Sequence, residues 1–499
     1  MNDNTLRRGP IVASMLIGSI ITLLSQTLLN VALPSMQQDL GVSTNTIQWL
    51  MNGYMLVNGV LVPVSAYLIE RFSTRRLYFA SMGLFFLGTL ISAIAPNFGI
   101  LLAGRLVQAA GGGIMMPLSM LVFLTIFPVE KRGRAMGMMG LAMVFAPAVG
   151  PTLSGWIVEH FSWRVIFYVF MPLSLLAWIF GYYSIRNVTR PSSHKLDIPG
   201  AVLSTLGFGG LLYGFSEAGN QGWTSPAVIS ILLIGAVSLI LFIWRQLGIQ
   251  HPMLEFRVFK YNMFSLTTAI TGIVTMAMFS GMILIPIYMQ TLRGFTPLES
   301  GLVLLPGALV MGLMSPVTGV IFDKIGSRWL AVIGLIIVAV STYEFSRLTL
   351  DTPFVYILVM HAIRMFGMSI MMMPVQTEGI NQLPQRLNAH GTAMSQTLRN
   401  VFGALGTALL VTVMSNRANA RTEELLQSGH IDPQNQAAMS EITREALLYG
   451  IDSSFQVATG LAVAALLLAF FVRRVTPHDQ SRKAASGSKV EQTKPALGN

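Results

Sequence analysis

Two arginines lie within long apolar runs of the chain, and each has a polar neighbour three positions away. Arg105 precedes Gln108, and Arg364 follows His361. Residues three apart share one face of a helix. A guanidinium inside a membrane-spanning helix costs at least about 2.5–3.5 kcal/mol on insertion scales, so each arginine must face a cavity or a partner. Such pairs can attract an anionic solute, and His361 can exchange a proton near neutral pH. The alternative is a purely structural role.

The rest of the sequence offers little catalytic or cofactor chemistry. The chain has no cysteine, and its seven histidines do not fall at metal-ligand spacing. It has no P-loop motif and no Ser/His/Asp pattern, which disfavours an ATP-driven pump and an enzyme. The net charge of +11 is explained by where the basic residues fall, in the connections between apolar runs. We therefore predict no cofactor, no metal and no nucleic-acid partner.

The composition predicts an integral membrane protein. Of 499 residues, 53% are apolar and only 11% are charged, whereas a soluble chain carries about 25% charged residues. The first apolar run, 11–34, is too long for a signal peptide and should remain as a span. Lysine and arginine concentrate in alternate connections, which predicts an even number of spans with both termini in the cytoplasm. The fourteen predicted helical spans are about 11–34, 47–69, 77–96, 99–123, 134–157, 163–185, 197–217, 226–244, 263–291, 299–321, 329–347, 354–376, 391–414 and 455–472.

The chain repeats itself at half its length. Residues 66–77 and 319–330 each hold an acid followed by a base at the end of an apolar run, and they are 253 residues apart. Gly150 and Gly403 have the same separation. Such a repeat predicts a transporter built from two similar bundles about a central site. The separation exceeds the length of six helices by about 60 residues, which leaves room for two further helices at 197–244.

These observations predict an all-α membrane protein with two pseudo-symmetric six-helix bundles. The first bundle is expected at 1–190, two additional helices with their linkers at 191–250, and the second bundle at 251–475. Within the second bundle, the polar stretch 415–454 is predicted to be a loop outside the cell with room for a short surface helix. Residues 476–499 are predicted to form a disordered cytoplasmic tail.

Four motifs then occur in order along these runs. They are the repeated loop pair, the glycine-rich segment from Arg105 to Pro117, the Gly-Pro segment from Gly140 to Gly155, and Asn30-Val-Ala-Leu-Pro34. In this order the chain resembles the major facilitator superfamily, over about residues 11–475. The Gly-Pro segment resembles its antiporter branch. The fourteen spans resemble the EmrB/QacA type of drug:proton antiporter. The amino-acid sequence as a whole is most similar to lincomycin-resistance-type multidrug exporters of Gram-positive bacteria.

The resemblance implies the major facilitator fold and export of amphipathic drugs by alternating access. The proton gradient would supply the energy, and the protein would act as a monomer in the cell membrane. The alternative is a dedicated exporter or flippase of one solute, such as a lipid or an anionic metabolite. A cavity lined by methionine would adapt to varied drugs, and the chain has 31 methionines. Methionine that merely replaces leucine toward lipid is the competing interpretation.

The repeated loops are candidate gates. An acid at a helix end can accept hydrogen bonds from the N-terminus of a neighbouring helix and so latch one conformation. The first copy departs from the family, because Ala66 and Ser73 replace glycines and Glu70 replaces aspartate, whereas the second copy keeps Asp323. We therefore expect the second latch to match the family's geometry more closely. With the Gly-Pro segment, which allows close helix packing and bending, the candidate gating residues are Glu70, Arg71, Arg75, Gly150, Pro151, Gly155, Gly319, Asp323, Lys324, Gly326 and Arg328.

Proton coupling requires a titratable group. Many drug exporters of this type carry an acid in the first span, where this chain has Ser25 and Gln26, and neither residue can hold a proton. We expect Glu378 to carry the coupling proton, with His361 as the second choice. The candidate pathway for substrate and protons comprises Gln26, Asn30, Tyr54, Asn58, Arg105, Gln108, Tyr288, Gln290, His361, Arg364, Glu378 and Arg399.

Overall fold

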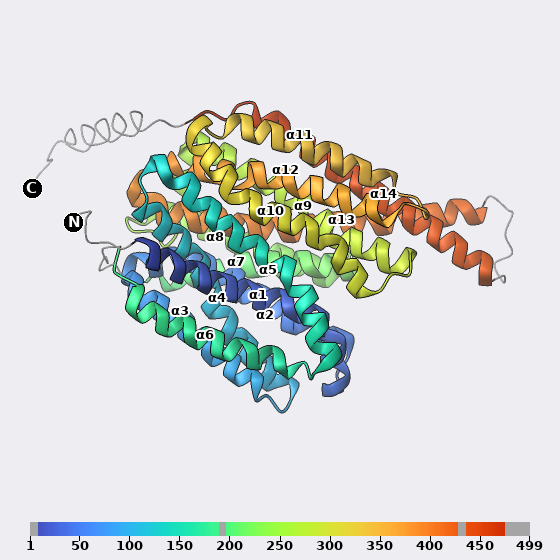
Figure 1. Ribbon diagram of the computed structural model, residues 1–499, viewed down its shortest axis with the longest axis horizontal. Coiled ribbons are helices and arrows are strands. Elements are labelled where there is room, and N and C mark those ends of the chain that lie inside the picture. The colour runs from blue at the N-terminus through green and yellow to red at the C-terminus, as the bar shows by residue number, and fades with distance from the viewer. Residues whose placement is uncertain (1–7, 189–195, 428–435, 475–499) are drawn as a thin grey trace, which may run out of the picture.

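The computed structural model describes residues 8–188, 196–427 and 436–474, and within these ranges the regular structure is entirely helical (Figure 1). Fourteen α-helices are joined by short connections, and α9 continues into a π-helical turn, η3, at Tyr288–Leu292. The α-helices are α1 Arg8–Leu40, α2 Thr44–Arg71, α3 Thr74–Ala93, α4 Phe98–Ile126, α5 Arg132–His160, α6 Arg164–Ser184, α7 Ile198–Gln221, α8 Pro226–Gly248, α9 Asn262–Ile287, α10 Pro297–Ile325, α11 Arg328–Glu344, α12 Phe354–Asn381, α13 Asn388–Gln427 and α14 Gln436–Ala469.

Thirteen of these helices are long and apolar enough to cross a membrane, judged over the described residues. The remaining one is α5, and the side chains of several of its residues, Pro151 among them, lie outside the described part. Each helix falls on one of the fourteen predicted spans. The all-helical fold class is therefore confirmed.

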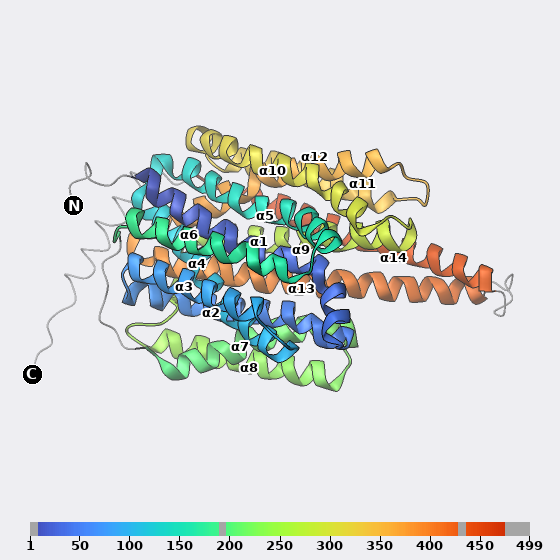
Figure 2. The ribbon, with the colours of Figure 1, turned by 60° about the horizontal axis from the view of Figure 1, so that its bottom comes forward.

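The predicted loop at 415–454 is wrong. Helix α13 continues to Gln427 and α14 already begins at Gln436, so both helices extend well past the predicted span ends. In Figures 1 and 2 these extensions project from the bundle side by side. Arg421 bonds to Glu424 one turn on and to Glu445 of the other helix, at 2.9 and 2.8 Å. The polarity of this stretch indicated contact with water, but its alanine, glutamate, arginine and leucine residues also favour helix.

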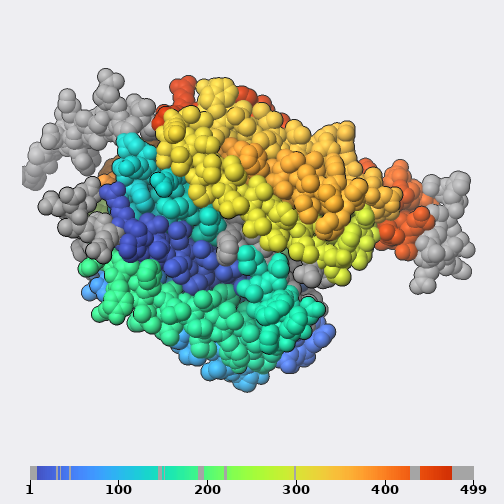
Figure 3. Space-filling model, viewed as in Figure 1, coloured from blue at the N-terminus to red at the C-terminus, as the bar shows by residue number. Residues whose placement is uncertain are grey.

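The helices form two groups, and the pair α7 and α8 lies between these groups in the sequence. Figure 3 shows α1–α6 (blue to green) and α10–α12 (yellow to orange) as two adjoining masses. Helix α5 packs along α10 where the masses meet, and α7 packs on α8 and also touches α2 and α13. Figure 2 shows α7 and α8 at the edge of the molecule. The two approach closely because Gly210 faces Gly235, where added Cβ atoms would lie about 3 Å from the opposite backbone.

Helices of both groups are joined by polar contacts at one end of the bundle. We call this the terminal end, because α1 begins and α14 ends there. Ser14 near the start of α1 bonds to Ser184 at the end of α6. Arg474, after α14, donates to the carbonyl oxygen of Asp323 near the end of α10. The largest apolar cluster also crosses between the groups here, joining α1–α6 to residues such as Ile380 and Ala389.

The predicted division into 1–190, 191–250 and 251–475 stays a prediction. Its first boundary lies at 189–195, outside the described residues, as does the predicted tail at 476–499.

Candidate functional site

Arg105 is fully buried in the first bundle and is held by neutral groups. It donates to Gln108 and to the hydroxyl oxygen of Ser25 at 3.0 Å, and its guanidinium lies 4.3 Å from the ring centre of Tyr54. Gln108 in turn donates to Thr89 at 2.8 Å. Two guanidinium nitrogens, Nε and one Nη, have no hydrogen-bond partner among the described residues. Arg105 and Gln108 therefore share one face of α4, as predicted. That face contacts Ser25 of α1, one of the two positions where many exporters of this type carry an acid.

Arg364 occupies a similar place in the second bundle. It is fully buried, and it donates to Thr342 at 3.1 Å, to Ser280 at 2.9 Å and to the carbonyl oxygen of Ala277 at 2.5 Å. Within the described part of the chain, one Nη of Arg364 has no hydrogen-bond partner, and neither does Nδ1 of the buried His361. The histidine ring packs against Gly307 of α10, where a Cβ would lie 2.5 Å from it. Both arginines therefore bond within their own bundles.

A polar cavity lies where the second bundle faces the first. Helices α9, α12 and α13 form its wall. Arg399 donates to Gln396 at 2.7 Å and lies 3.8 Å from the sulfur of Met143 on α5. Gln376 lies 3.8 Å from the sulfur of Met120 on α4, and no described residue bonds to its buried Oε1. The lining residues are Thr267, Thr268, Thr271, Gly272, Gln376, Ser395 and Arg399.

The second copy of the repeated motif joins the two bundles at the terminal end. Asp323 of α10 accepts hydrogen bonds from the backbone N–H groups of Gly133 and Arg134, at 2.8 and 3.1 Å. These donors belong to the first turn of α5, where the helix dipole favours a negative charge. A Cβ on Gly319 would overlap the carbonyl oxygen of Gly133, so only glycine permits this approach. This contact, called here the α5–α10 gate, has the helix-end geometry that we predicted.

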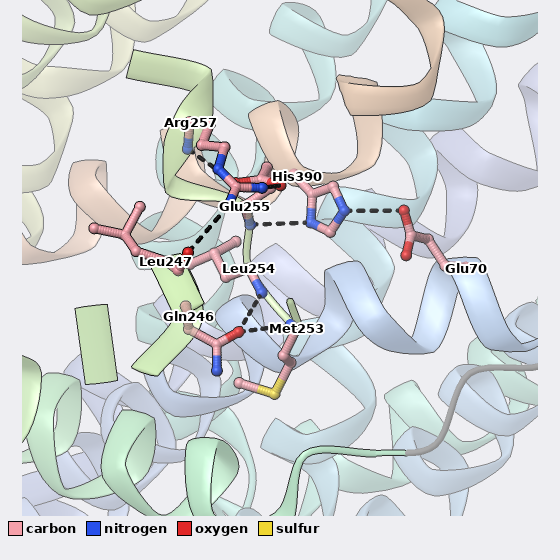
Figure 4. Close-up of polar contacts among 8 residues, drawn as sticks. All are labelled: Glu70, Gln246, Leu247, Met253, Leu254, Glu255, Arg257 and His390. Atoms are coloured by element: carbon pink, nitrogen blue, oxygen red, sulfur yellow. Dashed lines mark hydrogen bonds and ion pairs between the residues drawn. The ribbon is translucent and has the colours of Figure 1, made fainter. Parts of the chain in front are cut away.

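The first copy makes a different contact between the bundles. Glu70 at the end of α2 lies 3.0 Å from Nε2 of His390 in the first turn of α13. Nδ1 of His390 accepts the backbone N–H of Glu255 at 3.3 Å, so Nε2 carries the proton that faces Glu70. Figure 4 shows His390 between these two partners. We call this contact the α2–α13 gate.

The α2–α13 gate is continuous with the connection between α8 and α9. Gln246 of α8 accepts the backbone N–H groups of Met253 and Leu254, at 2.6 and 3.3 Å, two and one residues before Glu255 (Figure 4). Arg257 donates to the carbonyl oxygen of Leu247 at 3.0 Å. The segment that touches His390 is therefore fixed to α8.

Asp197 ties α7 to α8 beside this segment. It accepts bonds from Arg245 at 2.8 and 2.9 Å and from Gln246 at 2.8 Å. Burial by itself would raise the pKa of the Asp197 carboxyl, but the bonds from Arg245, the Gly200 backbone and Gln246 outweigh it and lower the pKa below its ordinary value. The carboxylate is therefore charged at neutral pH and holds the pair of helices together.

Other predicted gating residues bond within one bundle, are exposed or end a helix. Arg75 donates to the Tyr182 carbonyl oxygen at 3.2 Å, and its backbone N–H bonds to Asn187, so its contacts stay within the first bundle. The side chains of Arg71, Lys324 and Arg328 are exposed. Gly326 ends α10 with a φ of 83°, a conformation that favours glycine.

The Gly-Pro segment allows close helix packing at two of its three glycines, because a Cβ on Gly140 would also overlap the hydroxyl of Ser315 on α10. A Cβ on Gly150 would overlap the hydroxyl of Thr27, which itself donates to the Ala146 carbonyl oxygen at 3.1 Å. Gly150 thus permits close packing of α1 on α5. A Cβ on Gly155 would meet nothing within 4 Å, so the predicted close approach there is wrong.

The remaining predicted pathway residues are scattered. Tyr288 donates to the Thr349 carbonyl oxygen at 2.5 Å, Gln290 is exposed, and Gln26 and Asn58 are half-buried away from the cavity lining. The side chain of Asn30 lies outside the described part. Glu378 is buried, but it accepts a bond from Ser327 at 2.9 Å and does not line the cavity.

Two titratable residues were missed by the sequence analysis. His390 was one of seven scattered histidines, and only packing brings it to Glu70. Asp452 on α14 has a buried Oδ1 that accepts no hydrogen bond from the residues that the structure describes. It fell within the stretch that was read as a loop, so it was not counted among the acids of the spans. Correct helix assignment from the apolar residues on either side of it would have revealed it.

Comparison with known proteins agrees with this architecture. The family model described as Major Facilitator Superfamily matches residues 15–407. The chain is 49% identical to the uncharacterized MFS-type transporter YhcA of Bacillus subtilis, over 94% of this chain and 93% of that one. It is 43% identical to the lincomycin resistance protein LmrB of the same organism, over 93% and 96% of the two chains. Among solved structures, the human organic anion transporter MFSD10 superposes with a TM-score of 0.65 at 12% identity, covering 93% of this chain and 99% of that one. This chain belongs to the Major Facilitator Superfamily.

Proposed function

We propose that this protein exports amphipathic small molecules, drugs among them, across the cell membrane by alternating access driven by proton entry. A relative that is 43% identical over nearly the whole chain is named for lincomycin resistance. Similarity over this length supports a shared mode of transport, because the aligned region covers 93% of this chain and 96% of the relative. We infer that the protein acts as a monomer.

The observation that carries the proposal is the position of the gates relative to the cavity. Two contacts derived from one repeated motif join the bundles at the terminal end, and a polar cavity lies between the bundles a few helical turns deeper. Contacts made of a few hydrogen bonds can break and reform as bundles rock. Separation at the terminal end would open the cavity to that side.

The terminal end is proposed to face the cytoplasm. Lys131 and Arg257 lie in connections at this end, Arg71 is the last residue of α2, and Arg328 is the first residue of α11. An excess of lysine and arginine in short connections marks the cytoplasmic side of membrane proteins. In this orientation the extensions of α13 and α14 stand outside the cell.

Glu378 is proposed to carry the coupling proton, with His361 as the second choice. Glu378 lies near the terminal end, and its partner Ser327 belongs to the second copy of the motif. A proton entering the cell across 100 mV supplies roughly 2.3 kcal/mol, and each pH unit adds about 1.4 kcal/mol. Exchange of one proton for one neutral drug could therefore sustain a useful gradient.

The test is transport into proteoliposomes with an imposed pH gradient, using lincomycin and a small panel of amphipathic drugs. We expect accumulation that disappears when the gradient is collapsed by an ionophore. Glu378→Gln should remove accumulation but keep counterflow, whereas Glu344→Gln serves as the matched control, since Glu344 bonds Tyr356 near the opposite end. Absence of pH-driven accumulation for every compound would contradict the proposed function. Full coupling in both Glu378→Gln and His361→Ala would exclude these two carriers and leave Asp452 to be tested.

A further inference from the structure

We propose that the cavity at Arg399 binds the anionic group of the transported molecule, a carboxylate, sulfonate or phosphate, and that the protein therefore favours amphipathic anions over cations. This inference rests on the proposed export function and specifies its substrate class.

The first argument is the lack of a counter-charge. Arg399 has a neutral amide and a thioether as its neighbours, and no ion pair joins it to a carboxylate in the part of the chain that is described. None of the cavity-lining residues is acidic. A guanidinium removed from water is costly unless an anion or several acceptors satisfy it. A ligand anion would supply that partner, with the planar fork geometry that arginine prefers.

The second argument is the chemistry of the surrounding wall. Thr267, Thr268, Thr271 and Ser395 contribute hydroxyl groups beside Arg399, and Gln376 adds an amide. Several of these hydroxyls donate to carbonyl oxygens of their own helix, as Thr271 does to Thr267 at 2.8 Å. A hydroxyl rotor or amide can turn toward an anion with little cost. The set therefore offers donors around one fixed positive charge.

The third argument is the wider field of the bundle interior. Arg399 is half-buried, whereas Arg105 and Arg364 are fully buried, and neither of these two forms an ion pair with a carboxylate among the described residues. In a low-dielectric interior, uncompensated charges of one sign attract the opposite sign and repel their own. A cationic substrate passing between the bundles would meet this positive field with no acid at the cavity.

The cavity is small while the bundles are joined, with a volume of about 10 Å³, which leaves room for about one water-sized group. An anionic group would therefore reach Arg399 when the bundles separate, with the apolar body of the molecule extending between them. The sulfur atoms of Met120 and Met143 lie there, next to Gln376 and Arg399. Methionine adapts to varied apolar shapes, so the site would fix the charge and tolerate variation in the rest.

The test uses three fluorescent compounds of similar shape: naphthaleneacetate, its neutral amide and the cationic naphthylethylamine. Equilibrium dialysis of the purified full-length protein in nanodiscs measures binding, and proteoliposomes measure transport of the same compounds. We expect wild type to bind the acid about tenfold more tightly than the amide, which corresponds to one hydrogen bond to a charged group, and to bind the amine most weakly. Equal or tighter binding of the amine would overturn the inference.

Variants assign the effect to Arg399. Arg399→Gln should lose the preference for the acid, Arg399→Lys should keep most of it, and Gln376→Glu should reverse it in favour of the amine. Arg347→Gln, which removes an exposed arginine between α11 and α12 that does not line the cavity, is the matched control and should behave as wild type. If Arg399→Gln does not fold, the binding preferences of Gln376→Glu and Arg399→Lys test whether Arg399 binds the anion. A preference unchanged by Gln376→Glu and lost in Arg347→Gln would overturn the assignment.

Further measurements identify the source of the anion. They also distinguish a failure of the anion-site proposal from a failure of the proposed export function. Competition by excess inorganic phosphate, and by phosphatidylglycerol in the nanodisc, distinguishes a free phosphate, a lipid headgroup and a soluble amphipath. Transport of amine and acid at equal rates would refute anion selectivity and leave export standing. Tight, Arg399-dependent binding of the acid with no transport of any compound would support the anion site and refute the proposed export function.

Discussion

The two copies of the repeated motif join the bundles at the same end but by different chemistry. In the α5–α10 gate, the carboxylate of Asp323 accepts two backbone N–H groups from the first turn of a helix. In the α2–α13 gate, the carboxylate of Glu70 meets one histidine side chain. The α5–α10 gate depends on backbone donors and on a close approach of two helices, so it tolerates almost no change of side-chain size at Gly319. The second depends on side chains and connects to the α8–α9 segment. The pseudo-symmetry of the chain therefore preserves where the gates lie, but each gate has its own interactions.

The largest effect is expected where the copies differ in side-chain size. Gly319 corresponds to Ala66 in the repeat. Gly319→Ala would force a Cβ into the Gly133 carbonyl oxygen, and overpacking of this kind costs about 1–3 kcal/mol. We expect initial transport rates in proteoliposomes to fall about tenfold or more. Ala66→Gly is the matched control and should stay within about twofold of wild type. Normal transport by Gly319→Ala would break the comparison.

The next effect concerns the acid of the α5–α10 gate. Asp323→Asn keeps one acceptor oxygen but turns an NH₂ group toward a second N–H donor, and it removes the charge that the α5 dipole favours. We expect about a tenfold loss of transport with a small loss of thermal stability, since such helix-end charges contribute about 0.3–2 kcal/mol. Parallel measurements of transport rate and thermal unfolding check this. A loss of activity that merely follows unfolding would remove the gate role.

A smaller effect is expected at the α2–α13 gate. Glu70→Gln keeps an acceptor oxygen for the Nε2–H group of His390, and a neutral hydrogen bond has roughly half the strength of a charge-assisted one. We expect transport to fall about two- to fourfold. His390→Ala should cost more, because it also leaves the Glu255 N–H without its acceptor. The ranking is wrong if Glu70→Gln impairs transport more than Asp323→Asn does.

The smallest effect lies beside the α2–α13 gate, where Asp197 binds Arg245. Because the folded pKa of Asp197 is lowered, its contribution to stability is fully present above its unfolded pKa, about 3.9, and is lost as the pH falls through the folded value. Asp197→Asn should therefore lower stability by about 1 kcal/mol or less at neutral pH. The difference from wild type should shrink below about pH 4. Thermal unfolding from neutral to acid pH measures this, and a difference that grows in acid would contradict it.

Much of the fold followed from sequence because it depends on local patterns. Apolar run length located the helices, and the repeat located Asp323 at a helix end. The error at 415–454 arose because polarity reports exposure to water and leaves helix formation open. Arg421 could not be paired with Glu445 before the path of both helices was known.

The candidate site was harder to predict because it depends on packing. Arg105 and Gln108 were found from spacing along one helix. The partner of Glu70 is more than 300 positions away, and nothing local distinguishes His390 from the other histidines. Glu378 was chosen for its position in the chain, yet Ser327 holds it away from the cavity. Arg399 was included from its motif, but only the structure revealed its hydroxyl-rich surroundings.

The most direct test of the account is a distance measurement across the α5–α10 gate. The chain has no cysteine, so Lys131→Cys and Lys324→Cys, both at exposed positions, can carry two spin labels without background. Double electron–electron resonance in nanodiscs should give a short distance for the joined gate and a longer one when substrate or acid pH opens it. Asp323→Asn should enrich the longer distance without ligand. A single distance that is unchanged by substrate, by pH and by Asp323→Asn would contradict the claim that this contact is a gate.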